Sequence, residues 1–326
     1  MKAITLKDFG GPDMMQFSEV KTPSPGDGQI LIQVKATSVN RPDIIQRQGN
    51  YPAPPGDSEI LGLEVAGIVG SVGKNVNRYK PGDRVFALVG GGGYAEYTLA
   101  REDHSMPIVG ALSFEQAACI CETYITAYLN LFMLGELEGK QSVLIHGGGG
   151  GVATAAIQLS KALTPDTEIF VTASSGKIER VENQGADHVI DYRNEDFAAE
   201  VKRITEKRGI DVILDHIGAK YLEPNLKSLA VGGSMVLIGV MGGIKAEINL
   251  AMLMVKRQRI IGSVLRSRPV AQKASIIKQF EQAVMPLFAS GTISPLIHAT
   301  FPLSKAAEAH ELMENGGHFG KIVLLP

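Results

Sequence analysis

The stretch Ile145–Ser160 reads IHGGGGGVATAAIQLS and contains five consecutive glycines, Gly147 to Gly151. A short apolar strand, Ser142–His146, precedes the glycines, and a helical pattern follows them. A flexible linker rarely separates a buried strand from its crossover helix. In the first turn of a βαβ unit, glycines allow a tight turn and let backbone amides approach a pyrophosphate at the helix N-terminus. The run therefore predicts a dinucleotide-binding turn rather than a linker between two halves.

Strand and helix patterns continue to alternate after this turn. Further strands are expected at Glu168–Ala173, His188–Tyr192, Asp211–Gly218, Ser234–Val240 and Arg259–Leu265. Helical patterns lie between them, and one of these, Lys220–Gly233, is interpreted as a helix with a break. Nearly continuous apolar strands that alternate with helices predict a parallel sheet covered on both faces.

The residues before this alternating region are rich in strands and turns. Apolar residues alternate with period two along Gln29–Val39, and Glu64–Gly73 and Asp83–Val89 are further predicted strands. The stretch Ser113–Gly135 lacks proline and has helical spacing, with a capping box at its start and a glycine stop at its end. The tail predicts two more helices and a final strand, Gly320–Leu325.

Composition limits the class of protein. The chain has 326 residues, of which 44% are hydrophobic and 20% charged, and its net charge is −2. These values predict a globular protein with two domains, and the lack of a basic block makes nucleic-acid binding unlikely. No signal peptide or membrane span is expected, so the protein is expected to be cytoplasmic. Cys119 and Cys121 are interpreted as small, buried, reduced residues.

The end of the second predicted strand of the alternating region indicates which dinucleotide binds. NAD-selective sites usually carry an acidic residue there to hold the ribose 2′-hydroxyl. No acidic residue occurs from Val171 to Lys177, and Ser174 and Ser175 lie in that segment instead. Hydroxyls and an ammonium would hold a 2′-phosphate, which favours NADPH. The alternative is that Lys177 is only a solvated residue at the start of the next helix.

Several long segments together resemble one known family, the quinone oxidoreductase branch of the medium-chain dehydrogenase/reductase superfamily, close to its zeta-crystallin-like and PIG3-like members. The resemblance extends over the whole chain. Its segments are SVNRPDIIQRQGNYPAPPG (Ser38–Gly56), ILGLEVAGIVGSVG (Ile60–Gly73), KPGDRVFAL, LIHGGGGGVATAAIQL, GADHVIDY, LIGVMGG and LRSR (Leu265–Arg268).

The resemblance implies an α/β fold with two domains. Residues 1–122 and 266–326 would form a GroES-like, β-rich substrate domain, and residues 123–265 a Rossmann NADPH-binding domain. The active site would be the cleft between the two domains. The implied reaction is hydride transfer from NADPH to quinones or related conjugated carbonyls without a metal. The implied assembly is a homodimer in which the last Rossmann strands join edge to edge.

The zinc ligands of metal-dependent relatives are missing from the matching positions. Leu63 replaces the histidine of the relatives' Gly-His-Glu segment, and Asn40 and Arg41 lie where a cysteine ligand is expected. The four-cysteine structural lobe is also absent. Leucine offers no donor atom, so no catalytic zinc is expected.

The resemblance also assigns site residues. Tyr51 matches a tyrosine above the substrate pocket, and its alternative is a ring that packs on the loop prolines. Asn40 is predicted as a catalytic residue and as a cofactor contact. The expected cofactor contacts are Asn40, Thr126, Gly147, Gly150, Gly151, Val152, Ser174, Lys177, Tyr192, Gly239, Met241 and Leu265. His146 is interpreted as structural.

The chain departs from the family pattern at a few positions. Gly150 replaces a serine of the PIG3-like turn, Ala153 replaces the last glycine, and Gly316 and Gly317 lie where some relatives carry an arginine that contacts the 2′-phosphate. Since the reduced oxygen of a quinone can take its proton from water, no dedicated general base is expected. Two alternatives remain open: an enone or enoyl C=C reductase, and an NADPH-binding redox-sensing or crystallin-like module with little turnover.

Overall fold

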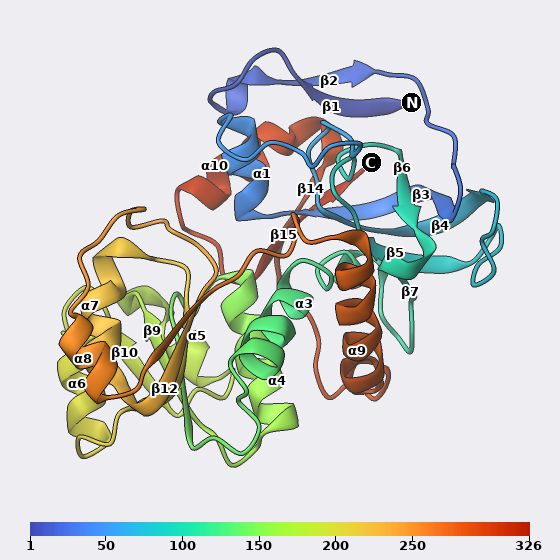
Figure 1. Ribbon diagram of the computed structural model, residues 1–326. Coiled ribbons are helices and arrows are strands. Elements are labelled where there is room, and N and C mark those ends of the chain that lie inside the picture. Colours follow the sequence, from blue (N-terminus) through green and yellow to red (C-terminus); the bar gives the residue numbers. More distant parts are fainter. The chain divides into compact units, whose positions relative to one another are not determined.

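The computed structural model describes residues 1–326, which divide into two compact units (Figure 1). Unit 1 joins Met1–Ile125 to Arg266–Pro326, and unit 2 is Thr126–Leu265. In the colours of Figure 1, unit 2 runs from green to orange, and unit 1 takes the blue and red ends of the scale. None of the helices is both long enough and apolar enough to span a membrane.

Unit 2 is built on a six-stranded parallel sheet. Its strand order, β10-β9-β8-β11-β12-β13, is the doubly wound order 3-2-1-4-5-6 of dinucleotide-binding folds. The order reverses between β8 and β11, and folds of this kind bind ligands outside the carboxyl ends of the strands at that switch point. The strands are β8 (Ser142–Ile145), β9 (Glu168–Ala173), β10 (His188–Asp191), β11 (Ile210–Asp215), β12 (Leu229–Leu237) and β13 (Arg259–Gly262).

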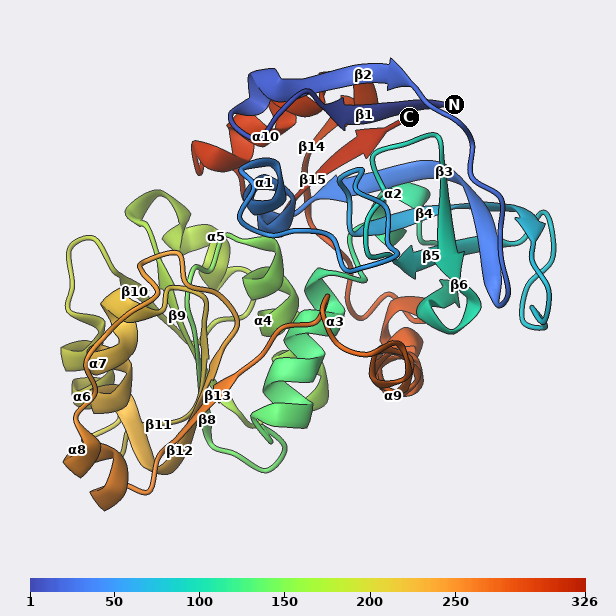
Figure 2. The same ribbon diagram turned by 45° about the horizontal axis from the view of Figure 1, so that its top comes forward.

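Helices cover both faces of this sheet, as the continuous apolar strands predict. On one face, side chains of β8, β9, β10 and β11 form a core with Val201 of α6 and Leu226 of α7. Helix α4 lies on the opposite face in both views (Figures 1 and 2). The helices of unit 2 are α4 (Gly151–Leu163), α5 (Ile178–Glu182), α6 (Phe197–Ile204), α7 (Ala219–Ser228) and α8 (Leu250–Val255).

Unit 1 contains the β-rich part of the chain. A seven-stranded sheet follows the order β14-β15-β3-β4-β5-β7, with β6 paired to β3, and β1 and β2 form a separate pair. The alternation along β3 buries every second side chain, so Ile30, Ile32 and Val34 pack with residues of β4 and β5. The strands are β1 (Lys2–Leu6), β2 (Met15–Glu19), β3 (Gln29–Val39), β4 (Glu64–Val72), β5 (Arg84–Leu88), β6 (Tyr97–Arg101), β7 (Ser105–Pro107), β14 (Ile297–Pro302) and β15 (Lys321–Leu325).

A second core of unit 1 joins segments from the two ends of the chain. Figure 2 shows β1 and β2 beside α10, and Ile4 of β1 packs in one cluster with Met313 of α10 and Ile322 of β15. The α/β class predicted from the sequence, with a β-rich part and a doubly wound parallel sheet, is confirmed. The helices that lie wholly within this unit are α1 (Arg41–Arg47), α2 (Phe114–Ala117), α9 (Val270–Ala289) and α10 (Ala306–Glu314).

The predicted helical stretch Ser113–Gly135 is interrupted. The Ser113 cap forms as expected, but the stretch divides into α2, α3 (Thr123–Tyr128) and a π-helix over Leu129–Leu134. The break lies where the backbone N–H of Glu122 donates to the Glu64 carboxylate, 2.9 Å away, instead of to a helical carbonyl. A contact between distant residues therefore lies directly before α3, in a segment where local spacing predicts a continuous helix.

Other boundaries also differ from the sequence prediction: the predicted strand Asp211–Gly218 is observed as Ile210–Asp215, and Ser234–Val240 as Leu229–Leu237. The predicted helix Lys220–Gly233 ends at Ser228, and the residues after it begin β12, which pairs with β11 along Ile210–Asp215. From Leu229 onward, pairing with β11 decides the conformation, although the local sequence favours a helix. The predicted strand Arg259–Leu265 ends at Gly262.

Candidate functional site

The glycine turn leaves no room for side chains at Gly147 and Gly148, and at Gly149 a side chain would have to displace the flexible end of Lys177. Gly147 has φ +69°, and a Cβ there would lie 2.5 Å from the His216 ring. A Cβ on Gly148 would lie 2.5 Å from a methyl of Val171, and a Cβ on Gly149 would lie 2.5 Å from the side chain of Lys177. The backbone of the turn is therefore closely surrounded, as a turn that must approach a ligand requires.

The turn leads directly into the N-terminus of α4. Gly150 is the N-cap residue, and α4 begins at Gly151 and runs for 13 residues. Gly151 and Val152 are half-buried. The first amides of a helix lack intrahelical acceptors and carry a partial positive charge, which suits a pyrophosphate. The structure places these predicted residues together at the carboxyl end of β8.

Two further predicted residues lie around the same point of the sheet. The backbone N–H of Met241 donates to the carbonyl of His216 at 3.1 Å, and a Cβ on Gly239 would lie 3.0 Å from that carbonyl oxygen. Gly147 contacts the ring of the same histidine. Gly147, Gly239 and Met241 are therefore brought together at the switch point. His216 was not predicted, and its position directly after β11 is the signal that could have found it.

The predicted 2′-phosphate contacts lie at the carboxyl ends of β9 and β10. Asp191 anchors this region, because its carboxylate accepts a 2.5 Å hydrogen bond from the Ser175 hydroxyl and a 2.8 Å bond from the Asn194 amide. Tyr192 follows Asp191 and is 41% exposed, and its N–H donates to Ala173. Sequence reasoning missed Asp191 because it belongs to the third strand of the sheet.

Positive charges gather in this region. Burial lowers the pKa of Lys177, and the positive charges of Arg180 and Arg193 lower it further. Two cations, Arg180 on the helix that Lys177 begins and Arg193 after β10, therefore act on Lys177 near the end of β9. Such mutual repulsion is relieved when an anion binds among them. The two arginines were not predicted as site residues.

His146 is buried and engaged at both ring nitrogens. Nδ1 lies 2.9 Å from the Thr172 hydroxyl, and Nε2 lies 2.8 Å from the Asn225 side-chain oxygen. Burial lowers the pKa of His146 to about 3, so the ring stays neutral. This geometry agrees with a structural role.

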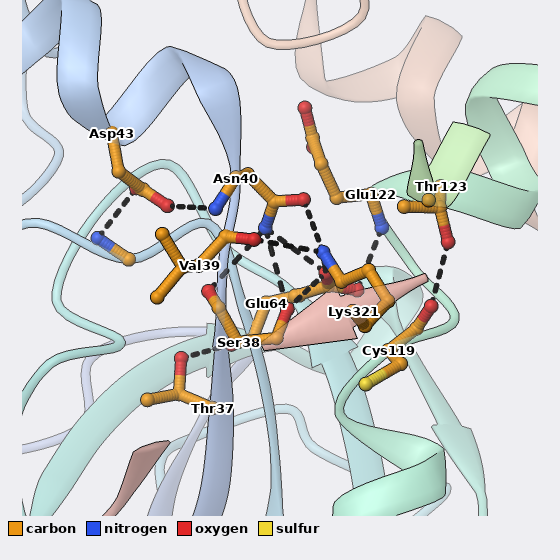
Figure 3. A network of polar contacts seen from close by, with 12 residues as sticks. Thr37, Ser38, Val39, Asn40, Asp43, Glu64, Cys119, Glu122, Thr123 and Lys321 are labelled. Carbon is orange, nitrogen blue, oxygen red and sulfur yellow. Dashed lines mark hydrogen bonds and ion pairs between the residues drawn. The ribbon is translucent and has the colours of Figure 1, made fainter. Parts of the chain in front are cut away.

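A buried polar network in unit 1 surrounds Asn40 (Figure 3). The Lys321 ammonium donates to the Asn40 side-chain oxygen at 2.5 Å, and to Val39 O and a Glu64 carboxylate oxygen, both at 3.1 Å. The Asn40 amide nitrogen donates to the same Glu64 oxygen at 3.0 Å. Both ends of the Asn40 side chain are thus bound within the protein, and this residue is only 5% exposed.

Asp43 fixes the backbone around this network. Its carboxylate accepts from the N–H groups of Asn40 at 2.8 Å and Gly62 at 3.0 Å, and from the Tyr94 hydroxyl at 3.3 Å. Burial raises the pKa of Asp43 to about 6, although these N–H donors oppose the shift. The carboxylate therefore holds α1 against the segment before β4.

Tyr51 is half-buried and stacks with an arginine. The Arg266 guanidinium lies 5.1 Å from the centre of its ring and donates to the Tyr51 carbonyl at 3.4 Å. Arg266 itself is held by Gly90 O and by the Gln46 side chain. Burial and then the Glu122 charge raise the pKa of Tyr51 to about 12, so its hydroxyl keeps its proton and can donate.

The remaining predicted residues have less distinctive surroundings. Thr126 lies in α3, where its carbonyl accepts from the Asn130 amide, and it is half-buried. Leu265 is 7% exposed and follows β13. Ser174 is half-buried and caps the turn that carries Lys177.

The comparisons with known proteins agree over the whole length. Residues 26–110 match the alcohol dehydrogenase GroES-like domain, and residues 184–324 match a domain described as zinc-binding dehydrogenase. The rat quinone oxidoreductase is 35% identical over 100% of this chain and 98% of its own. A quinone oxidoreductase of Pseudomonas syringae pv. Tomato DC3000 is similar in structure, with a TM-score of 0.90, 30% identity, and coverage of 100% of this chain and 99% of its own. A mycobacterial protein solved with NADPH has a TM-score of 0.88 at 27% identity, with both chains fully covered.

The residues of this chain do not fit the zinc ion that one family model's description names. Leu63 is an aliphatic side chain, 1% exposed, and Asn40 and Glu64 already bind the Lys321 ammonium. No group of three or more His, Cys, Asp or Glu side chains is arranged to hold a metal. A metal would need neutral or anionic donors that Leu63 cannot provide.

The resemblance stated from the sequence is confirmed by these matches. The match to a GroES-like domain and the parallel sheet of unit 2 agree with the fold class that the resemblance implies. The chain belongs to the quinone oxidoreductase branch of the medium-chain dehydrogenase/reductase superfamily.

Proposed function

We propose that the chain is an NADPH-dependent quinone oxidoreductase that transfers hydride, without a metal, to quinones or similar conjugated carbonyls. Membership of the family makes it an oxidoreductase with a nicotinamide cofactor and a small-molecule substrate. The observation that carries the proposal is the glycine turn at the switch point together with the three cations at the end of β9. The neighbour solved with NADPH supports the same cofactor.

Most of the proposed cofactor contacts lie in unit 2. The N-terminus of α4 would hold the pyrophosphate, and Lys177, Arg180 and Arg193 would hold the 2′-phosphate. Ser174 and Tyr192 would complete that pocket. Gly239 and Met241 would border the nicotinamide end near His216. When bound, the cofactor supplies the hydride.

The proposed substrate contacts lie in unit 1. The protonated Tyr51 hydroxyl would donate a hydrogen bond to the substrate oxygen on which negative charge develops. Arg266 would orient the tyrosine ring by stacking on it. Asn40 would act through the shape of the buried network rather than as a free donor, because both ends of its amide are already bound.

The assembly and the compartment belong to the same proposal. β13 is the last strand of its sheet, and Ile260 on it is 37% exposed. A second copy paired to that edge would cover it and form the expected homodimer. We place the protein in the cytoplasm.

The acceptor is tested by comparing kcat/KM for 9,10-phenanthrenequinone with that for a conjugated enone, both at saturating NADPH. A value at least about tenfold higher for the quinone supports the proposal. A higher value for the enone would move the function to C=C reduction. NADPH binding without turnover of either would indicate a binding or sensing module.

A further inference from the structure

The end of β9 carries no acidic residue of its own, but an acid from the next strand lies beside it. Asp191, the last residue of β10, pairs in the parallel sheet with Ala173, the last residue of β9. Its carboxylate Oδ2 accepts a hydrogen bond from the Ser175 hydroxyl at 2.5 Å. Dinucleotide folds that select NAD place an acid at the end of this second strand, where it holds the ribose 2′-hydroxyl. Unit 2 therefore supplies from β10 the acid that the sequence lacks between Val171 and Lys177.

This contact lies in the same turn as the proposed phosphate-binding lysine. Ser175 is exposed and begins the turn Ser175–Lys177, which continues from the end of β9. The other end of the turn lies against the dinucleotide-binding glycines, because a Cβ on Gly149 would lie 2.5 Å from the Lys177 side chain. The Asp191–Ser175 pair is therefore fixed beside the turn that carries Lys177.

The Asp191 carboxylate is held in place and ionised. Oδ2 also accepts from the Asn194 side-chain amide at 2.8 Å, and Oδ1 accepts from the Arg193 backbone N–H at 3.0 Å. The hydrogen bond from Ser175 is the largest influence that lowers the pKa of Asp191, and the Arg193 charge also lowers it. Arg193 acts on Lys177 as well, so one negative charge shares this region with the cations.

The hydroxyl of Ser175 has a single proton, and Asp191 accepts it. The Asn194 amide donates to the Ser175 oxygen at 3.3 Å. A hydroxyl has one O–H donor and two acceptor lone pairs, so this oxygen has only a lone pair left to offer a ligand. A phosphate dianion also offers only acceptors, whereas a ribose hydroxyl can donate. The Asp191–Ser175 pair therefore suits a 2′-hydroxyl and not a 2′-phosphate.

We propose that Asp191, acting through Ser175, is a specificity-determining residue that lowers the preference for NADPH over NADH. This inference rests on the proposed function, in which Lys177, Arg180 and Arg193 hold the 2′-phosphate. The Asp191 charge repels that phosphate, and the Ser175 oxygen accepts a hydrogen bond from the 2′-hydroxyl of NADH. The three cations outweigh the one carboxylate, so NADPH stays the preferred cofactor. Ser175 then differs from the sequence interpretation, in which the hydroxyls of this segment hold the phosphate.

Ser175→Ala separates the two roles that the hydroxyl could have. Because its proton already goes to Asp191, loss of the hydroxyl should change the Kd of NADPH by less than about twofold. The Kd of NADH should rise at least about threefold, because its 2′-hydroxyl loses an acceptor. Fluorescence titration with each cofactor measures both values. A loss of affinity confined to NADPH would overturn the inference, because it would show that the hydroxyl donates to the phosphate.

Asp191→Asn removes the charge but keeps an oxygen that can accept from Ser175. The Kd of NADPH should fall at least about threefold at low salt, because the phosphate is no longer repelled, while the Kd of NADH should change less than about twofold. This gain should shrink as salt is added, since the screening length is about 10 Å at 0.1 M ionic strength. A change in the shape of the turn alone would not depend on salt in this way.

Asp211→Asn is the matched control. Asp211 also accepts from a serine hydroxyl, that of Ser142 at 3.1 Å, but at the start of β8 and β11 and so at the opposite ends of the strands. Both affinities should stay within about twofold of the wild type in this variant. An unchanged NADPH affinity in Asp191→Asn, an equal gain for NADH, or a gain that salt does not reduce would overturn the inference. A wild type that binds NADPH but reduces no quinone would overturn the proposed function and leave this comparison of affinities standing.

Discussion

In the proposed function, Lys177 holds the 2′-phosphate that distinguishes NADPH from NADH. Its side chain passes against Gly149, and the charges of Arg180 and Arg193 act on it. Lys177→Ala should remove one charge-assisted contact to a 2′-phosphate, worth about 1.5–3 kcal/mol, and so weaken NADPH binding roughly tenfold or more. NADH has no 2′-phosphate, so its binding should change less than about twofold.

Fluorescence titration with each cofactor measures this difference. Lys202→Ala, which removes an exposed lysine of α6, controls for loss of general positive charge in unit 2. Equal losses of NADPH and NADH affinity in Lys177→Ala would contradict the assignment of Lys177 to the phosphate.

Tyr51 can be tested without disturbing its packing. Tyr51→Phe keeps the ring on which Arg266 stacks at 5.1 Å and removes only the hydroxyl. If that hydroxyl donates to the developing oxyanion, kcat/KM should fall about tenfold or more for every quinone tested. Wild-type values across the acceptors would mean that the ring only packs against its neighbours.

Candidate site residues differ in whether a local pattern of the sequence can reveal them. The glycine turn and Lys177 follow consecutive local patterns, so spacing alone predicted them. Arg193 follows another strand, and only the folded chain brings its charge to Lys177. The break before α3 involves a contact with Glu64, 58 residues earlier in the chain.

The glycine turn makes a prediction at the scale of the element. In Gly148→Ala the new methyl would lie within 3 Å of Val171 and Val181, both fully buried. We expect the free energy of unfolding to fall by about 1–3 kcal/mol, because neither valine has space to move. Gly150 is different, because a Cβ there would lie no closer than 3.4 Å to any atom beyond its neighbours in the chain, the nearest being the Gly147 carbonyl oxygen. The backbone at Gly150 is also extended, so it accepts any residue.

Gly150→Ser therefore serves as the matched control. Serine at an N-cap suits α4, so the free energy of unfolding should stay within about 0.5 kcal/mol of the wild type. Urea unfolding of both variants measures the difference. Equal destabilisation by the two substitutions would show that the turn tolerates no added atom at either place.

Secondary structure was predictable where the residues of an element alone determine its conformation. The strand Glu168–Ala173 was predicted with its observed bounds, because its apolar run is flanked by clear turn signals. Leu229–Gly233 was predicted as helix but belongs to β12, since pairing with β11 decides its conformation. The π-helix over Leu129–Leu134 has no sequence pattern that distinguishes it from an α-helix.

At the scale of the whole molecule, the doubly wound parallel sheet was predictable and the buried network of unit 1 was not. Strands alternating with helices predict a doubly wound sheet, and β8–β13 adopt that order. The network joins Asn40 to Lys321, which are separated by 281 positions, so no local spacing reveals it. In that network the Asn40 and Glu64 oxygens that could otherwise bind a metal accept hydrogen bonds from Lys321. Removal of metals should therefore leave the activity unchanged.

The most direct test of the account is the steady-state oxidation of NADPH and NADH by the purified, chelator-treated protein with 9,10-phenanthrenequinone as acceptor. The account predicts turnover that the chelator does not reduce, with kcat/KM at least about tenfold higher for NADPH than for NADH. Turnover lost on chelation and restored by zinc, or an equal kcat/KM for the two cofactors, would contradict it.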